Sequence, residues 1–140
     1  MATTGEESRR EGGGERRPKC VVGIGASAGG LEALERFFDQ TPLDTGVAYV
    51  VVQHLSPDFE SLMPELLVRH TQLPVRTVAD DMLVERDTIY LIPRGKEMYI
   101  RNGRLRLNDK DPSKKLTLPI DIFFQSLARD VGSRSIGVIL

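Results

Sequence analysis

Short apolar runs alternate along this chain with stretches in which apolar residues recur at helical spacing. Cys20–Gly25 and Val47–Val52 have the length and composition of buried strands. Gly29–Phe38 and Pro119–Val131 instead place their apolar residues along one side of a helix. Strands that alternate with helices in this way indicate an α/β protein whose sheet is mostly parallel.

The remaining predicted elements continue this pattern. The pair Asn102-Gly103 joins two of the predicted strands as a tight hairpin. A helix is predicted at Ser61–His70, where Pro64 is tolerable only within the first turn. Further strands are predicted at Val75–Val78, Thr88–Ile92, Glu97–Arg101, Arg104–Leu107 and Ser135–Leu140.

Composition limits the classes of protein to which the chain can belong. Residues 1–18 are polar and offer no apolar run to bury, so we expect a disordered tail before one domain at residues 19–140. The net charge of −1 predicts no nucleic-acid partner, and the absence of a long apolar run predicts no insertion into a membrane. The single cysteine, Cys20, excludes a disulfide framework and a cysteine-rich zinc site, which fits the cytoplasm.

The stretch Gly25-Ala26-Ser27-Ala28-Gly29 matches the pattern Gly-x-Ser-x-Gly at a predicted junction of strand and helix. In that context the pattern forms a nucleophile elbow. Small neighbours let the backbone bend sharply and lift the serine hydroxyl out of the sheet. The amide groups that start the helix face the same spot, and the Ala28 amide is suited to donate to a developing oxyanion. Ser27 is therefore a candidate nucleophile.

A serine nucleophile needs a base, and His54 is the candidate. Gln53-His54 ends the next predicted strand, and the carboxyl ends of parallel strands meet at one edge of a sheet. Ser27 and His54 therefore share a rim if their strands are adjacent. His54 would take the hydroxyl proton and later return it to the leaving group. A carboxylate at the end of another strand would complete a triad.

A second pattern overlaps the first. Gly23, Gly25 and Ala28 fit the looser form of the dinucleotide fingerprint, Gly-x-Gly-x-x-Gly/Ala. That fingerprint requires a carboxylate at the end of the second strand to hold the ribose. Here Gln53 stands near that end and Asp44 precedes the strand, so the sequence disfavours a dinucleotide site without removing the alternative.

Several stretches of the chain, taken together, carry a resemblance to a known family. They are Val22–Gly30, Val51–Leu55, Ile89–Pro93, Pro119–Asp121 with Phe124–Ala128, and Ile136–Leu140. In order and spacing they resemble the protein-glutamate methylesterase domain of bacterial chemotaxis, over almost all of the chain after the tail. The Ser-Ala-Gly-Gly turn and the Leu-Pro-Ile-Asp-Ile-Phe-Phe run look most like versions fused to a receptor methyltransferase.

The resemblance implies an open, mostly parallel sheet with helices on both faces, which is a three-layer, Rossmann-like fold. It implies a Ser-His-Asp triad that hydrolyses γ-glutamyl methyl esters on methyl-accepting chemotaxis receptors, with some members deamidating receptor glutamines. Ser27 matches the nucleophile and His54 the base, and no metal or other cofactor is implied. A receiver domain or a methyltransferase, fused or separate, is a further implied partner.

Two features depart from the family pattern. Ala28 stands where many members have threonine, which keeps the backbone amide and removes a hydroxyl. The family's triad aspartate lies in a Thr/Ser-Gly-x-Gly-x-Asp-Gly segment expected just after Leu140, so we expect a fold that is incomplete at its C-terminal end and a chain inactive alone. Asp58, on a turn that leads away, and Asp121, at a helix start, are not expected to replace it. A receptor- or partner-binding module without a triad therefore stays open as an alternative.

Overall fold

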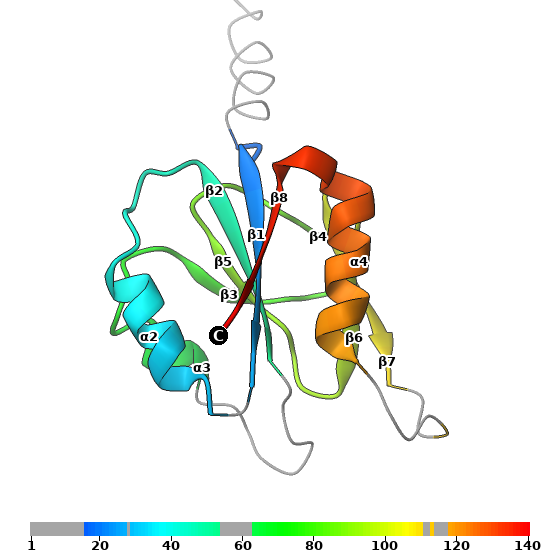
Figure 1. The fold of residues 1–140 in the computed structure, drawn as a ribbon, viewed down its shortest axis with the longest axis horizontal. Coiled ribbons are helices and arrows are strands. Elements are labelled where there is room, and N and C mark those ends of the chain that lie inside the picture. The colour runs from blue at the N-terminus through cyan, green and yellow to red at the C-terminus, as the bar shows by residue number, and fades with distance from the viewer. Residues whose placement is uncertain (1–15, 28, 54–62, 111–112, 114–117) are drawn as a thin grey trace, which may run out of the picture.

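The computed structural model describes residues 16–27, 29–53, 63–110, 113 and 118–140, and its centre is a sheet of five strands (Figure 1). The strand order is β3-β5-β2-β1-β8, and every neighbouring pair is parallel, which confirms the predicted α/β class. The strands of this sheet are β1 (Cys20–Ala26), β2 (Val47–Gln53), β3 (Val75–Thr77), β5 (Ile89–Leu91) and β8 (Ser135–Ile139). The helices are α2 (Leu31–Asp39), α3 (Met63–Leu67) and α4 (Pro119–Val131), with a short 3-10 turn at Gly132–Arg134.

Helices α2 and α4 lie on opposite faces of the sheet, which gives three layers (Figure 1), and a cluster of buried side chains lies on each face. On one face, Ile24 of β1 lies in a buried cluster with Leu34 and Phe38 of α2. On the other face, Val21 of β1 lies in a second buried cluster with Phe123 of α4. One strand serves both clusters because successive side chains of a strand point to opposite faces. Helices on both faces are what the family resemblance implied.

α4 packs closely against β1 because glycines in the strand leave room for it. A Cβ atom added at Gly23 would lie 3.0 Å from Cδ2 of Leu127. The helix spans the predicted residues, and Pro119 occupies its first turn, where the absence of an amide costs nothing. Ile120 lies against Gly25, so the start of α4 stands over the carboxyl end of β1.

A separate antiparallel sheet packs on the α4 side of the main sheet, in the order β4-β7-β6. Asn102 and Gly103 join two of its strands with φ angles of 52° and 72°, which confirms the predicted hairpin. Ile100 and Leu105 of this hairpin lie in the same buried cluster as α4. The sequence predicted neither β4 nor the separation of the hairpin from the main sheet. The strands are β4 (Met82–Leu83), β6 (Lys96–Arg101) and β7 (Arg104–Asp109).

The helix predicted at Ser61–His70 is shorter in the structure. α3 ends at Leu67, and residues 61–62 lie outside the described residues. The chain then tightens, since the amide of His70 donates to the carbonyl of Leu67 at 2.9 Å, a spacing of three residues rather than four. His70 therefore follows the helix instead of belonging to its last turn.

The predicted tail meets the domain at its last residues. Pro18 is buried, and its carbonyl accepts a hydrogen bond from Nη1 of Arg134 at 3.2 Å. The carbonyl of Arg16 accepts another from the amide of Arg86 at 2.9 Å. Residues 1–15 lie outside the described residues, so their disorder stays a prediction.

Candidate active site

Ser27 follows β1 directly and is exposed at the edge where that strand ends. The chain turns at this point, because the amide of Gly30 donates to the carbonyl of Ser27 at 2.9 Å and α2 begins at Leu31. A strand, a tight turn and a helix in succession form the context that a nucleophile elbow requires. Ala28, whose amide is the candidate oxyanion donor, lies outside the described residues.

Close contacts explain two of the glycines around this serine. A Cβ atom added at Gly25 would lie 2.7 Å from Cγ2 of Ile120, and one added at Gly30 would lie 3.0 Å from Cβ of Ala26. Gly29, the second glycine of the Gly-x-Ser-x-Gly pattern, has open space around the same position. A side chain would therefore be too close to its neighbours at Gly25 and at Gly30, whereas Gly29 has room for one.

The strands that precede Ser27 and His54 are adjacent, which was the condition for placing the two residues on one rim. In the register of β1 and β2, Ala26 pairs with Gln53. The next residue in the chain is Ser27 after Ala26 and His54 after Gln53. His54 and Asp58 lie outside the described residues. The role of His54 therefore stays a prediction.

The side chain of Gln53 reaches the serine turn, a contact that the sequence analysis did not anticipate. Its Nε2 atom donates to the carbonyl oxygen of Ser27 at 3.0 Å, and the residue is only 7% exposed. The sequence does contain one indication of this contact, because Gln53 is a polar residue at the end of a buried strand, immediately before the candidate base His54. β2 thus ends in a neutral amide, and it offers no carboxylate for a ribose, which weighs further against the dinucleotide interpretation.

Ser27 lies where the strand order of the sheet reverses. β1 stands between β2, which follows it in the chain, and β8, which is reached only after the rest of the fold. α2 and α4, which lie in the two connections, are on opposite faces of the sheet (Figure 1). In open α/β sheets, ligands bind at such a reversal point, outside the carboxyl ends of the strands. The start of α4 reaches the same edge, with Asp121 exposed in its first turn.

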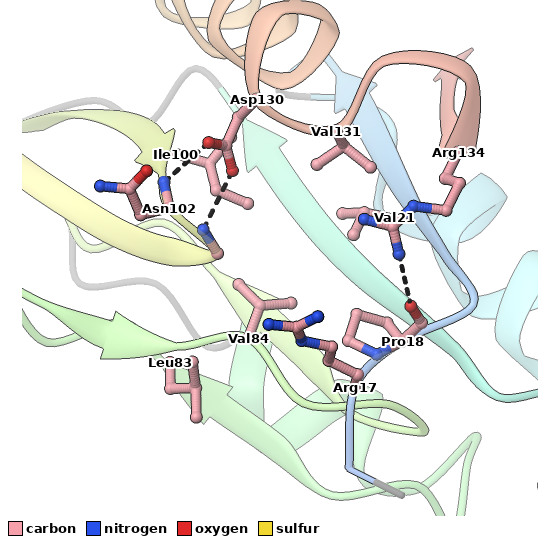
Figure 2. A pocket seen from close by; sticks show the side chains of 11 residues that line it. Arg17, Pro18, Val21, Leu83, Val84, Ile100, Asn102, Asp130, Val131 and Arg134 are labelled. Atoms are coloured by element: carbon pink, nitrogen blue, oxygen red, sulfur yellow. Dashed lines mark hydrogen bonds between the residues drawn. The ribbon is translucent and has the colours of Figure 1, made fainter. Parts of the chain in front are cut away.

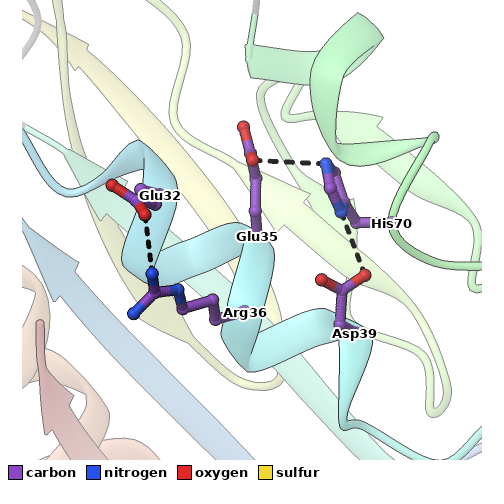
Figure 3. A network of polar contacts seen from close by, with 5 residues as sticks. All are labelled: Glu32, Glu35, Arg36, Asp39 and His70. Atoms are coloured by element: carbon purple, nitrogen blue, oxygen red, sulfur yellow. Dashed lines mark hydrogen bonds and ion pairs between the residues drawn. The ribbon is translucent and has the colours of Figure 1, made fainter.

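His70 is not brought to Ser27 but to the outer side of α2. Figure 3 shows its imidazole between two carboxylates of that helix. Nδ1 lies 2.9 Å from Oδ1 of Asp39, and Nε2 lies 3.2 Å from Oε2 of Glu35. Each ring nitrogen thus has a carboxylate oxygen of α2 within reach. The group ties the segment after α3 to α2, so its role here is structural.

A cavity of about 420 Å³ is lined in part by Pro18 and Val21 (Figure 2). Because these residues stand at the start of β1, the cavity lies at the opposite end of that strand from Ser27. Most of its polar groups already serve the fold. Asp130 accepts hydrogen bonds from the amides of Asn102 and Gly103 at 2.7 and 3.0 Å, and Arg134 donates to Pro18.

Within the described ranges there is no group of three or more side chains suited to bind a metal ion. In the same part of the chain, no helix has the length and apolar character needed to cross a membrane.

A serine on a strand-to-helix elbow, at the reversal point of a parallel sheet, defines an α/β protein built like a serine hydrolase. The sequence matches the CheB methylesterase family over residues 22–140. The chain therefore belongs to the CheB methylesterase family, as its resemblance to the chemotaxis methylesterases predicted.

Curated relatives share this stretch. The chain is 36% identical over 124 residues to protein-glutamate methylesterase/protein-glutamine glutaminase 2 of Xanthomonas oryzae pv. oryzae (strain MAFF 311018), which covers 86% of this chain and 34% of that protein. It is 33% identical over 135 residues to the protein-glutamate methylesterase/protein-glutamine glutaminase of Desulfitobacterium hafniense (strain Y51), covering 91% and 34%. The chain thus spans about a third of the length of these relatives.

A solved structure has the same fold. The crystal structure of the Thermotoga maritima CheB methylesterase catalytic domain superposes with a TM-score of 0.72 at 26% identity. The match covers 86% of this chain and 66% of that chain. It agrees with the open parallel sheet and its covering helices that were predicted for this sequence.

Proposed function

We propose that this chain supplies the nucleophile and the base of a protein-glutamate methylesterase that acts on methyl-accepting chemotaxis receptors. The observation that carries the proposal is Ser27, exposed on an elbow between β1 and α2 in a member of the CheB methylesterase family. The names of the relatives join methylesterase and glutaminase, so we extend the proposal to receptor glutamines.

The first chemical step forms an acyl-enzyme. His54 takes the proton of Ser27 as the hydroxyl oxygen attacks the γ-carbonyl carbon of the receptor side chain. The amide of Ala28 donates to the oxyanion that develops on the carbonyl oxygen. Collapse of this intermediate breaks the ester bond, and methanol leaves with the proton that His54 had taken. A glutamine substrate follows the same course and releases ammonia.

The second step returns free enzyme. Water attacks the acyl carbon while His54 takes one of its protons, and the second tetrahedral intermediate releases glutamate and restores Ser27. Each proton is carried by the imidazole, and the charge on oxygen is met by a backbone amide. The proposed reaction therefore uses neither a metal ion nor another cofactor.

The partners follow from the family. We propose action in the cytoplasm on the receptor's methylated segment, with a receiver domain or a methyltransferase, fused or separate, controlling access to it. The third triad member is proposed to be an aspartate in a segment that follows Leu140. Residues 1–140 alone would then bind receptor and react slowly.

Covalent labelling tests the assignment of Ser27. We expect a fluorophosphonate to modify the protein at Ser27 when the chain is extended past Leu140 by the aspartate-bearing segment, as mapped by mass spectrometry of its peptides. Ser27→Ala should abolish the modification, whereas Ser133→Ala, which removes an exposed serine at the other end of the sheet, should leave it unchanged. Undiminished labelling of Ser27→Ala would refute the assignment.

A second assay addresses the substrate. Methylated receptor fragments incubated with the protein should release methanol in a Ser27-dependent manner. Receptor binding that persists without any release of methanol, also after a C-terminal extension that carries the aspartate, would instead favour the binding module.

A further inference from the structure

We propose that Gln53 is a positioning residue for the reaction, because its amide fixes the peptide group that follows the nucleophile. The inference rests on the proposed function of Ser27. Gln53 touches no substrate in this scheme and acts through the backbone of the serine turn. It is one of two buried polar residues in the described part of the chain, the other being Thr88.

The carbonyl of Ser27 is held by two hydrogen bonds from different directions. The amide of Gly30 donates to it at 2.9 Å and closes the turn locally. Nε2 of Gln53 donates to it at 3.0 Å from the neighbouring strand, 26 residues away in the sequence. A carbonyl has two lone pairs, so both donors are accommodated at once. The turn is thereby tied to β2 as well as to itself.

Because the peptide bond is planar, the hydrogen bond from Gln53 to the Ser27 carbonyl also orients the amide proposed as the oxyanion donor. The carbonyl of one residue and the amide of the next belong to one rigid, trans unit and point in opposite directions. Fixing the direction of the Ser27 carbonyl therefore fixes the direction of the amide that follows it in the chain. That amide is the group proposed to stabilise the oxyanion, and a displacement of about 1 Å in such a group can cost about a hundredfold in rate.

The position of Gln53 also links the two proposed catalytic groups. Its backbone ends β2 opposite Ala26, and the next residue along the chain is His54. One residue therefore holds the nucleophile turn with its side chain and leads into the base with its main chain. A neutral amide suits this place, because an ionised carboxylate has no hydrogen to donate and would repel the Ser27 carbonyl.

The test compares Gln53→Met with Thr88→Val. Gln53→Met keeps the side-chain length and removes the donor. Thr88→Val removes a matched buried bond, from its Oγ1 to the carbonyl of Arg86 at 3.1 Å, at the start of β5 rather than beside Ser27. Both variants lose one buried side-chain bond to the backbone, so a general loss of stability affects them alike.

Two measurements separate positioning from stability. In amide hydrogen exchange followed by NMR, Gln53→Met should raise the exchange rate of the Gly30 amide about tenfold relative to Thr88→Val, because the carbonyl that holds this amide has lost its second anchor. Fluorophosphonate labelling of Ser27 should be slowed about ten- to a hundredfold in Gln53→Met and remain near the wild-type rate in Thr88→Val.

A second variant keeps the test valid if Gln53→Met does not fold. Gln53→Glu should label slowly near neutral pH, and its rate relative to wild type should rise in mild acid, because a neutral carboxylic acid regains a donor. A residue with only a structural role would not produce this pH-dependent ratio.

The outcomes distinguish the inference from the proposed function. If wild type labels at Ser27 but Gln53→Met labels equally fast, or if Thr88→Val is slowed as much, the inference is overturned. A ratio for Gln53→Glu that does not change with pH also overturns it. If wild type is not labelled even when it carries the C-terminal segment with the aspartate, the proposed function fails, and exchange at Gly30 still decides whether Gln53 orients the turn.

Discussion

The amide of Leu140 donates a hydrogen bond to the carbonyl of Gly25 at 2.9 Å, two residues before Ser27. The contact continues the parallel register of β8 on β1, in which Ile139 pairs with Gly25. It brings the end of β8 to the edge of the sheet that carries the nucleophile. A residue that follows β8 therefore starts at the edge of the sheet that carries Ser27, on the side of β1 opposite to β2.

This geometry predicts the effect of a C-terminal extension. We expect a protein that continues from Leu140 with the family's glycine-rich, aspartate-bearing segment to label with fluorophosphonate about ten-thousandfold faster than residues 1–140 alone. The matched control replaces the segment's aspartate with asparagine and should lose most of the gain. Equal rates for the extended and unextended proteins would contradict a triad completed after β8.

The glycines of the serine turn should differ in their tolerance of a methyl group. Gly25→Ala places a Cβ atom 2.7 Å from the branched Cγ2 of Ile120, which must move with the start of α4, so the free energy of unfolding should fall by about 1–3 kcal/mol. Gly29→Ala meets nothing within 4 Å and should change that free energy by less than about 0.5 kcal/mol. Urea unfolding of both variants checks this, and equal losses would contradict it.

Elements that depend on local spacing could be predicted from the sequence. α4 was predicted at its observed bounds, because Pro119 marks a helix start and the apolar residues after it keep helical spacing. The hairpin was predicted because Asn102 and Gly103 adopt positive φ readily. β4 was missed because two residues, Met82–Leu83, carry no periodicity, and the strand exists only through its pairing with β7.

Contacts between distant segments could not be predicted in this way. Ser27 was found from a pattern of five consecutive residues, but the donation from Gln53 depends on the register of two strands 26 residues apart. His70 was predicted only as the last residue of a helix, whereas its partners Glu35 and Asp39 come from another helix. Sequence spacing carries no information about either contact, because each is set by how the layers pack.

The contact between His70 and Asp39 should be measurably stronger than an exposed ion pair. Their side chains are 30% and 44% exposed, and Glu35 holds the imidazole from its other nitrogen (Figure 3). A double-mutant cycle with alanine at both positions should give a coupling of about 0.5–1 kcal/mol, near the upper end for surface pairs.

The control for this cycle is the pair of Arg36 and Glu32 on the same helix. Their side chains are 77% and 75% exposed, and solvent screens their 2.7 Å contact. We expect a coupling of about 0.3–0.5 kcal/mol, with a larger proportional loss in high salt. A coupling for His70 and Asp39 no larger than this would show that the second carboxylate adds nothing.

The hydroxyl of Tyr90 should matter more to stability than that of Tyr99. Tyr90 is 1% exposed, and its hydroxyl accepts from the amide of Glu85 at 2.7 Å and donates to the carbonyl of Leu83 at 3.2 Å. Tyr90→Phe leaves both backbone groups without this partner and should cost about 1–3 kcal/mol in unfolding experiments. Tyr99→Phe is the control, because its hydroxyl has no hydrogen-bond partner among the described residues, and it should change little.

The same hydroxyl predicts a loss of stability in alkali. Burial raises the pKa of Tyr90 above the ordinary tyrosine value of 10.0, because the phenolate would lose its hydration inside the protein. Above that ordinary value the unfolded chain releases the proton while the folded chain keeps it, so the stabilisation is complete below it and declines as the pH rises toward the folded pKa. The difference in unfolding free energy between wild type and Tyr90→Phe should therefore shrink as the pH rises above the ordinary tyrosine value of 10.0. A difference that stays constant above that value would mean that the folded protein ionises Tyr90 as easily as the unfolded chain does.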